Sequence, residues 1–239
     1  MMKNVSAVIV SNRTGRHLKT PVPLLPFGDT TILGRTLLAY LGAGFSEIVL
    51  VLSYRASDVQ ASLGPLAEKI QLATSADPDE EFGSLLRRGC EKISPASKAF
   101  AIGMGDQPLL TTELITELAH KFTAAKARIL VPVCQGHVGF PSYFDMSVLP
   151  DFKKLNPRQE ICDVLKARAS EVVDCGVFET AVARHVDDLE DYHAMLRMAG
   201  LAIPQLPETA EDGNGTQPEP AQGTDPGILG QVRRVDSDS

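Results

Sequence analysis

Residues 99–111 read AFAIGMGDQPLLT, and this stretch decides the fold. Its first six residues are apolar or small, which is typical of a buried strand. Asp106 follows the end of that strand, in a turn that contains a proline. A helix is predicted to begin at Thr111 and to run through Leu118 and Phe122. A buried strand, a turn and a helix in this order are the repeating element of α/β folds.

The same alternation extends along the chain in both directions. Further apolar runs that predict strands cover residues 5–10, 47–52, 70–73 and 128–133. Helices are predicted between them. Residues 32–43 carry leucines at helical spacing. Residues 57–60 (SDVQ) match a capping box that opens a helix, and residues 77–80 (DPDE) place Asp77 at the N-cap of another. Strands that alternate with helices predict right-handed crossovers and a mostly parallel sheet.

Residues 136–198 predict shorter elements. Residues 136–144 predict a loop that enters a short strand, residues 171–177 and 181–186 are strands that can pair, and residues 188–198 are a closing helix. Sheets of this type bind ligands at the carboxyl ends of their strands. We therefore expect the chemistry in the loops after Val10, Ala73, Met104 and Val186.

Charge is distributed unevenly over the 239 residues. Of the formal net charge of −7, residues 204–239 carry −5, with seven acids, two bases and five prolines. Such a segment buries too little apolar surface to offset its ordering entropy. We therefore expect one domain, residues 1–203, followed by a disordered, acidic, Pro/Gly-rich tail, residues 204–239. A partner-binding motif around Ile228 and Leu229 is the alternative to a purely solvating tail.

Composition also limits the class of protein. No run of residues approaches the roughly 20 apolar positions that cross a bilayer, and the N-terminus has no signal-peptide pattern. The acidic balance argues against non-specific binding of nucleic acid. The four cysteines are widely spaced and form no CxxC pair, which is typical of reduced thiols. We therefore expect a cytoplasmic protein that binds neither membrane nor nucleic acid.

Charged side chains gather after two of the predicted strands and before the closing helix. The loop of residues 11–19 (SNRTGRHLK) holds three fixed cations and can cradle phosphates, the alternative being a solvated basic loop. Asp106 is placed to hold Mg²⁺, which usually binds one or two carboxylates plus substrate phosphates; capping of its turn is the alternative. Asp187 can supply a second carboxylate, because Asp188 is better placed to cap the closing helix. Two carboxylates on one metal ion suit phosphoryl or nucleotidyl transfer.

A set of ordered segments narrows this expectation. They are residues 105–111 (GDQPLLT), 131–133 (VPV) with 135–136 (QG), 139–141 (GFP), and 186–187 (VD) ahead of 190–192 (EDY). Together they resemble the molybdenum-cofactor nucleotidyltransferases, and among these the CTP:molybdopterin cytidylyltransferases, over about residues 5–199. The resemblance implies a Rossmann-like, GT-A-like three-layer sandwich. It also implies Mg²⁺-dependent transfer of CMP or GMP from CTP or GTP to the phosphate of molybdopterin, with release of pyrophosphate.

The resemblance implies roles for individual residues. Asp106 and Asp187 match the two metal aspartates, and Gly83 with Ser84 matches a segment that helps to hold the nucleotide. In the loop of residues 11–19, Arg16 and Thr14 match the family pattern. Arg13, Arg16 and Lys19 are expected to neutralise the triphosphate, Arg16 and Lys19 as catalytic residues. Asn12, Arg13 and Thr14 are expected to contact the nucleotide.

Three positions depart from the family pattern. Asn12 stands at a glycine position, Val22 stands at the lysine position, for which Lys19 is a substitute, and Phe140 replaces the histidine of a Gly-His-Pro segment.

Three hypotheses about the function follow. The first is a nucleotidyltransferase of the molybdopterin type, and the second is a homologue without turnover that binds nucleotide or cofactor as a carrier or partner of a molybdoenzyme. The third is a transferase with a different phosphate acceptor.

Overall fold

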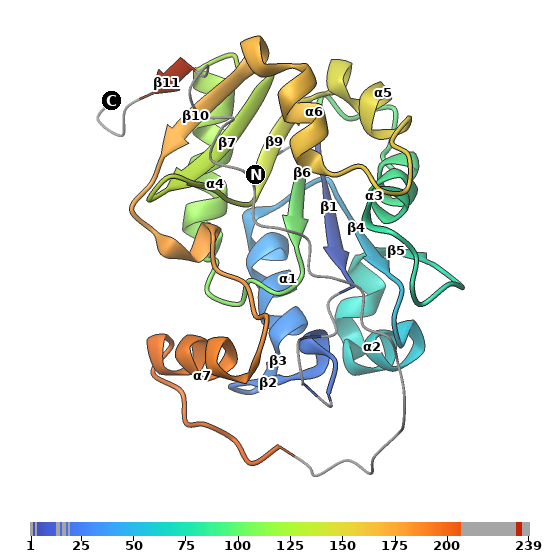
Figure 1. Cartoon of the computed structure of the whole chain (residues 1–239), viewed down its shortest axis with the longest axis vertical. Coiled ribbons are helices and arrows are strands. Elements are labelled where there is room, and N and C mark those ends of the chain that lie inside the picture. Colours follow the sequence, from blue (N-terminus) through green and yellow to red (C-terminus); the bar gives the residue numbers. More distant parts are fainter. Residues whose placement is uncertain are drawn as a thin grey trace.

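The computed structural model describes residues 2, 4–12, 15, 18, 20–206 and 233–235, and Figure 1 shows their arrangement. Within these residues, a nine-stranded sheet has the order β11-β10-β7-β9-β6-β1-β4-β5, with β8 paired to β7. Its strands are β1 (Val5–Ser11), β4 (Glu47–Leu52), β5 (Gln71–Thr74), β6 (Ala99–Met104), β7 (Ile129–Cys134), β8 (His137–Val138), β9 (Ser142–Asp145), β10 (Val172–Gly176) and β11 (Arg233–Val235). A separate hairpin joins β2 (Pro26–Phe27) to β3 (Thr30–Thr31).

The sheet is mostly parallel, as the alternation of strands and helices predicts. β1 pairs in parallel with β4 on one side and with β6 on the other, and β10 pairs in parallel with β7. β9 and the short β8 are the exceptions: β9 runs antiparallel between β6 and β7, and β8 pairs antiparallel with β7. The carboxyl ends of β1, β4 and β6 therefore lie at the same edge of the sheet, where the sequence predicts the chemistry.

Helices cover both faces of the sheet, which explains the unbroken apolar runs of its strands. On one face, Val8 and Val10 pack in a cluster with residues of α3 (Phe82–Glu91), α5 (Leu149–Phe152) and α6 (Ile161–Ala167). On the other, Ala7 and Ile9 pack with residues of α1 (Ile32–Ala43), α2 (Ala56–Ser62) and α4 (Thr112–Ala124). The result is the three-layer α/β sandwich that the family resemblance implies.

Two helix starts have the threonine caps that satisfy otherwise unpaired backbone N–H groups. Helix α4 begins within one residue of the predicted start, and Thr111 Oγ1 caps it by accepting from the N–H of Leu114 at 3.1 Å. Thr31 Oγ1 accepts from the N–H of Gly34 at 3.1 Å at the start of α1. Helix α1 ends at Gly44, whose φ of +76° is a left-handed conformation that glycine adopts without strain.

Two predicted caps are wrong. Helix α2 begins at Ala56, and its N-cap Arg55 makes no side-chain cap, so the capping box at residues 57–60 does not form. Asp58 instead accepts from Arg55 Nε at 2.6 Å. Asp77 accepts from the N–H of Asp79 in a local turn, and α3 begins only at Phe82. Asp77 thus serves a local turn in place of a helix start, because aspartates favour both positions.

The predicted strand at residues 181–186 is also wrong. Residues Thr180–Val182 form a 3-10 turn (η5), and the neighbours of β10 in the sheet are β7 and β11. Val186 is fully buried, but in a separate cluster with Val22, Phe27 and Tyr192. Its apolar character thus comes from packing against α7 (Leu189–Met198) and the β2–β3 hairpin, which lie together beyond one end of the sheet (Figure 1).

One strand lies inside the segment for which composition predicts a disordered tail. Residues 233–235 (β11) pair in parallel with Val173–Cys175 of β10, the strand that would otherwise form the edge of the sheet. The other tail residues from 207 onward, Ile228 and Leu229 included, lie outside the described residues. No helix in the described part of the chain is long and apolar enough to span a membrane.

Tyr40 offers a test of the core. It is fully buried, and among the described residues its hydroxyl has no hydrogen-bond partner. A buried hydroxyl without a partner costs free energy, so we expect Tyr40→Phe to raise the free energy of unfolding by about 1 kcal/mol. Tyr143→Phe is the matched control, because Tyr143 donates its hydroxyl to the carbonyl oxygen of Ile115 at 2.6 Å. Loss of that hydrogen bond should lower the free energy of unfolding by about 1 kcal/mol. Urea unfolding of both variants measures the difference, and equal losses in the two would contradict it.

Candidate active site

Asp106 lies where the loop after β6 meets the end of β1. The N–H of Gly105 donates to the carbonyl oxygen of Val10 at 2.8 Å, which ties the two strand ends together. Glycine is needed there, because a Cβ on Gly105 would lie 2.7 Å from the Cβ of Ser11. Asp106 is only 3% exposed. A carboxylate so deeply buried at a strand end is typical of a site that binds a cation.

A narrow hollow, without room for a water molecule inside it, lies beside this carboxylate. Val10, Ser11, Asn12, Pro23 and Asp106 line it. The structure thus brings together Asn12, predicted to contact nucleotide, and Asp106, predicted to bind metal. Ser11 Oγ is buried and has no hydrogen-bond partner among the described residues, so its hydroxyl is available to a ligand.

His185 faces Asp106 across the site. Its Nδ1 lies 3.2 Å from Asp106 Oδ1, and the two side chains are 19% and 4% exposed. The ring of Phe140 lies edge-on to the imidazole, with 6.1 Å between ring centroids. His185 was assigned no role from the sequence, although it stands two residues before the predicted metal residue Asp187. The contact joins residues 79 positions apart, which local pattern cannot show.

Gln107 connects the turn that carries Asp106 to the segment that carries His185. Its Nε2 donates to the carbonyl oxygen of Val182 at 2.7 Å, and the same oxygen accepts from the N–H of Phe140 at 2.8 Å. Gly139 fits tightly beside them, because a Cβ there would lie 2.6 Å from that oxygen. Three distant segments therefore converge on one carbonyl group, and sequence reasoning missed this junction.

Replacing Gln107 tests the junction. Gln107→Leu removes the donor to Val182 while the bond from Phe140 remains, so we expect a loss of about 1 kcal/mol confined to this region. Amides of residues 180–187 should then exchange with deuterium about fivefold faster. A loss of about 1 kcal/mol raises the equilibrium constant for local opening by that factor. Peptides from α4 are the internal control. Faster exchange throughout the protein would show instead that Gln107 supports the whole fold.

Asp187 lies in the irregular segment that leads into α7, and not at the end of a strand as predicted. Asp188 caps α7 by accepting from the N–H of Asp191 at 3.0 Å, as expected. The N–H of Asp187 donates to Asp191 Oδ2 at 3.1 Å. Because Asp187 follows His185 by two residues, the two Cα atoms are at most about 7 Å apart. The assignment of Asp187 to the metal stays a prediction.

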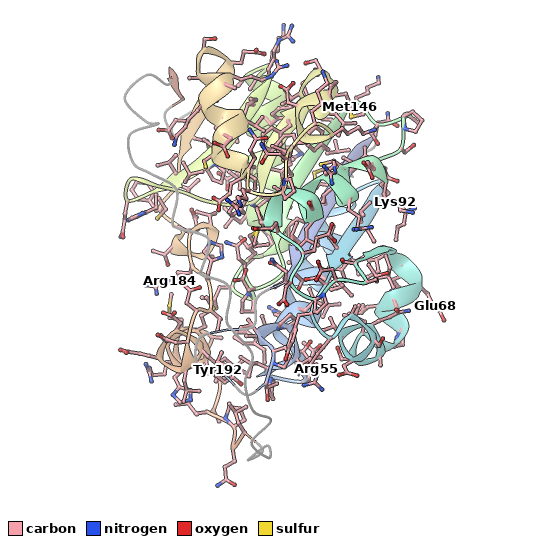
Figure 2. The ribbon with its side chains drawn as sticks, turned by 45° about the vertical axis from the view of Figure 1, so that its right-hand side comes forward. Arg55, Glu68, Lys92, Met146, Arg184 and Tyr192 are labelled. Atoms are coloured by element: carbon pink, nitrogen blue, oxygen red, sulfur yellow. The ribbon has the colours of Figure 1, made fainter. Side chains whose placement is uncertain are left out.

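Helix α7 is fixed to the hairpin near the start of the chain. Tyr192 donates its hydroxyl to the carbonyl oxygen of Pro26 at 2.6 Å, and burial raises the pKa of Tyr192 to about 12, so the phenol stays neutral. Figure 2 shows Tyr192 between α7 and the hairpin, while Arg184, just before His185, projects outward. Val22, at the position of the family lysine, is fully buried in the same cluster as Tyr192. Val22 therefore serves packing, and it presents no charge to a ligand.

Gly83 and Ser84 lie in the first turn of α3, and both are buried. The N–H of Gly83 donates to the carbonyl oxygen of Pro157 at 3.0 Å. A Cβ on Gly83 would overlap the carbonyl oxygen of Asn156 and lie 2.5 Å from that of Gln159. Gly83 is thus in close contact with the chain's own 156–159 loop. Contact of Ser84 with a nucleotide stays a prediction.

Four of the predicted site residues cannot be placed. Arg13, Thr14, Arg16 and Lys19 lie outside the described residues. Their expected roles at the triphosphate, Arg16 and Lys19 as catalytic residues and Arg13 and Thr14 as nucleotide contacts, remain predictions.

The described residues fit a divalent cation that a substrate helps to hold. Among them, no group of three or more His, Cys, Asp and Glu side chains is arranged to hold a metal ion. Asp106 nevertheless offers a buried carboxylate oxygen, and Asp187 stands two residues after His185, which contacts Asp106. A magnesium ion in a nucleotide-transferring site commonly takes one or two carboxylates and completes its shell with phosphates and water. The donor set therefore suits such a cation only together with a nucleotide.

The fold and the strand-end site define a Rossmann-like nucleotidyltransferase. Residues 8–172 match the family model of the MobA-like NTP transferase domain, and the chain belongs to that family. None of the curated proteins compared with the chain matches it.

Several solved structures share the fold. Rv0371c from Mycobacterium tuberculosis H37Rv is 24% identical, with a TM-score of 0.72 over 82% of this chain and 99% of that one. A complex of the same protein with manganese is 25% identical, with a TM-score of 0.69 over 82% and 99%. A nucleotidyl transferase from Methanothermobacter thermautotroptrophicus is 18% identical, with a TM-score of 0.69 over 82% and 97%.

Proposed function

We propose that the protein is a nucleotidyltransferase that moves CMP or GMP from CTP or GTP to the phosphate of molybdopterin and releases pyrophosphate. The observation that carries the proposal is the buried carboxylate of Asp106, which lines the hollow at the ends of β1 and β6 with Asn12. Membership of the MobA-like family supports nucleotide transfer, and the manganese complex of Rv0371c supports a divalent cation. The product would pass to a molybdoenzyme, and the reaction would take place in the cytoplasm.

The residues of the chain would divide the work between them. Asp106 and Asp187 would hold Mg²⁺, which neutralises the charge that develops on phosphate oxygens. Asn12 and the hydroxyl of Ser11 would donate hydrogen bonds to a triphosphate bound at the mouth of the hollow, and Arg13, Thr14, Arg16 and Lys19 would cover it from the adjoining loop. Ser84 would contact the nucleotide from α3. The burial of Asp106 keeps water away from one side of the site, which strengthens each of these interactions.

The acceptor would enter beside Phe140. This ring is 9% exposed and lies against His185, so it offers an apolar edge to a flat heterocycle such as a pterin. The polar junction of Gln107 with Val182 would fix the distance between that edge and Asp106. Nucleotide and acceptor would thus meet across Asp106.

The test is release of pyrophosphate from CTP or GTP in the presence of Mg²⁺ and molybdopterin. We expect release that depends on all three components and that Asp106→Asn slows about 100- to 1,000-fold. Release with another phosphorylated acceptor, and none with molybdopterin, would keep the transferase and replace the acceptor. Absence of release with every NTP and acceptor would overturn the proposal.

One observation favours a second candidate function. The position of the family lysine is filled by Val22, which is fully buried. Removal of a fixed cation from the triphosphate weakens catalysis more than binding. A protein of this kind would hold nucleotide or cofactor as a carrier or partner of a molybdoenzyme. Calorimetry that detects NTP binding without turnover would favour the carrier, and absence of binding would exclude it.

A further inference from the structure

The partner of Asp106 in this structure is an imidazole. His185 Nδ1 lies 3.2 Å from Asp106 Oδ1, and the Phe140 ring lies along one side of the imidazole. His185 is fixed in this position by its neighbours: Val182, three residues before, accepts from Gln107, and Val186, one residue after, is fully buried. The nitrogen is therefore held beside the carboxylate by the fold.

The two atoms lie at hydrogen-bond distance, and the same separation suits two ligands of a single ion. Bonds from a divalent cation to imidazole nitrogen or carboxylate oxygen are roughly 2.1 Å long, so two ligands at a right angle lie about 3.0 Å apart. The observed 3.2 Å is close to that separation. Ligation through Nδ1 leaves the proton on Nε2, which is one of the two neutral tautomers.

We propose that His185 is a metal ligand through Nδ1, and that the site prefers a first-row transition ion to Mg²⁺. The inference rests on the proposed function, because it places the ion at the same site. Magnesium takes oxygen ligands, whereas first-row transition ions accept imidazole nitrogen readily. Asp106 and Asp187 supply the oxygens, and the nucleotide phosphates complete the shell. Mn²⁺ is the stringent probe, because it is the least nitrogen-seeking of these ions.

The experiment uses the full chain, labelled with ¹⁵N-histidine, together with Mn²⁺ and a CTP analogue with a carbon bridge between the α- and β-phosphates. Pulsed electron paramagnetic resonance is expected to show ¹⁵N coupling to bound Mn²⁺. In His185→Asn this coupling disappears and the affinity for Mn²⁺ falls at least about tenfold, while that for Mg²⁺ changes less than about threefold. His120→Asn, a change of an exposed histidine on α4, is the matched control and is expected to leave all three values unchanged.

Each outcome decides one question. Bound Mn²⁺ without ¹⁵N coupling in the unaltered protein, equal losses for both ions in His185→Asn, or no ion binding at all would overturn the inference. The spectrum of the unaltered protein carries the test even if His185→Asn fails to fold. Coupling without pyrophosphate release from any NTP and acceptor would overturn the proposed function and leave the metal site in place. If the unaltered protein shows no ¹⁵N coupling and His185→Asn releases pyrophosphate with Mg²⁺ at the unaltered rate, the inference about His185 is overturned and the proposed function stands.

Discussion

Replacing Asp106 with Asn is expected to lower the rate of pyrophosphate release about 100- to 1,000-fold. Asn has nearly the same shape but no negative charge, so it binds a divalent cation poorly. A cation at the reacting phosphate contributes several kcal/mol to the transition state, and each 1.4 kcal/mol corresponds to a factor of ten in rate. Asp106 lines the hollow at the end of β6 and is 3% exposed, so bulk water cannot supply an equivalent ligand. Steady-state release of pyrophosphate, measured with each variant at saturating Mg²⁺, checks this.

A second buried aspartate provides the control. Asp174 is also 3% exposed, but it lies within β10, where it is in register with Val131 of β7. Asp174→Asn is expected to lower the melting temperature while the activity of the folded protein changes less than about threefold. Loss of activity of similar size in both variants would mean that any buried carboxylate supports the fold, and that Asp106 has no special role. Unchanged activity in Asp106→Asn would remove Asp106 from the metal site.

The central strands could be predicted because their signal is local. Residues 99–104 and 47–52 form β6 and β4 with the predicted bounds, and residues 5–10 form β1 with one more residue. A strand buried on both faces needs apolar side chains at every position, so the run of residues itself marks it. The start of α4 was also predictable from nearby residues, to within one position of Thr111.

The site could be predicted only in part, because its contacts are long-range. The strand-end rule places Asp106 at the active edge from sequence alone. The contact of His185 with Asp106 and the convergence of Gln107 and Phe140 on Val182 depend on how the segment between β10 and α7 folds back. An apolar run such as residues 181–186 does not reveal whether it pairs in a sheet or packs under a helix. The predicted strand there was wrong for this reason.

The predicted role of Gly83 shows the same limit. A glycine at the start of a helix is consistent with a close approach of nucleotide phosphate or of the protein's own backbone. In the structure, the N–H and the Cα of Gly83 both face the 156–159 loop, and Arg87 Nη1 donates to the carbonyl oxygen of Leu155 at 3.0 Å beside it. These two hydrogen bonds, from the N–H of Gly83 and from Arg87 Nη1, hold the loop against α3. The glycine is explained by the approach of this backbone.

Gly83→Ala is therefore expected to destabilise the fold strongly. Its methyl group would meet three backbone carbonyl oxygens, which cannot move aside as a flexible side chain would, so α3 and the loop must separate. Overpacking of this kind costs about 3 kcal/mol, which corresponds to a fall in melting temperature of roughly 6–12 °C for a domain of this size. Thermal unfolding followed by circular dichroism measures the change.

Gly176→Ala separates this packing effect from the general effect of replacing a glycine. No atom lies within 4 Å of a Cβ built on Gly176 in β10, so its melting temperature should stay the same or rise slightly. The affinity of the folded fraction for CTP distinguishes the two roles of Gly83. If the glycine serves packing, Gly83→Ala binds CTP within about threefold of the unaltered protein at temperatures where it is folded. If Gly83→Ala keeps its melting temperature and loses CTP binding, the glycine admits phosphate, and the contact with the 156–159 loop is incidental. The same measurement on Ser84→Ala then shows whether any part of the first turn of α3 contacts the nucleotide.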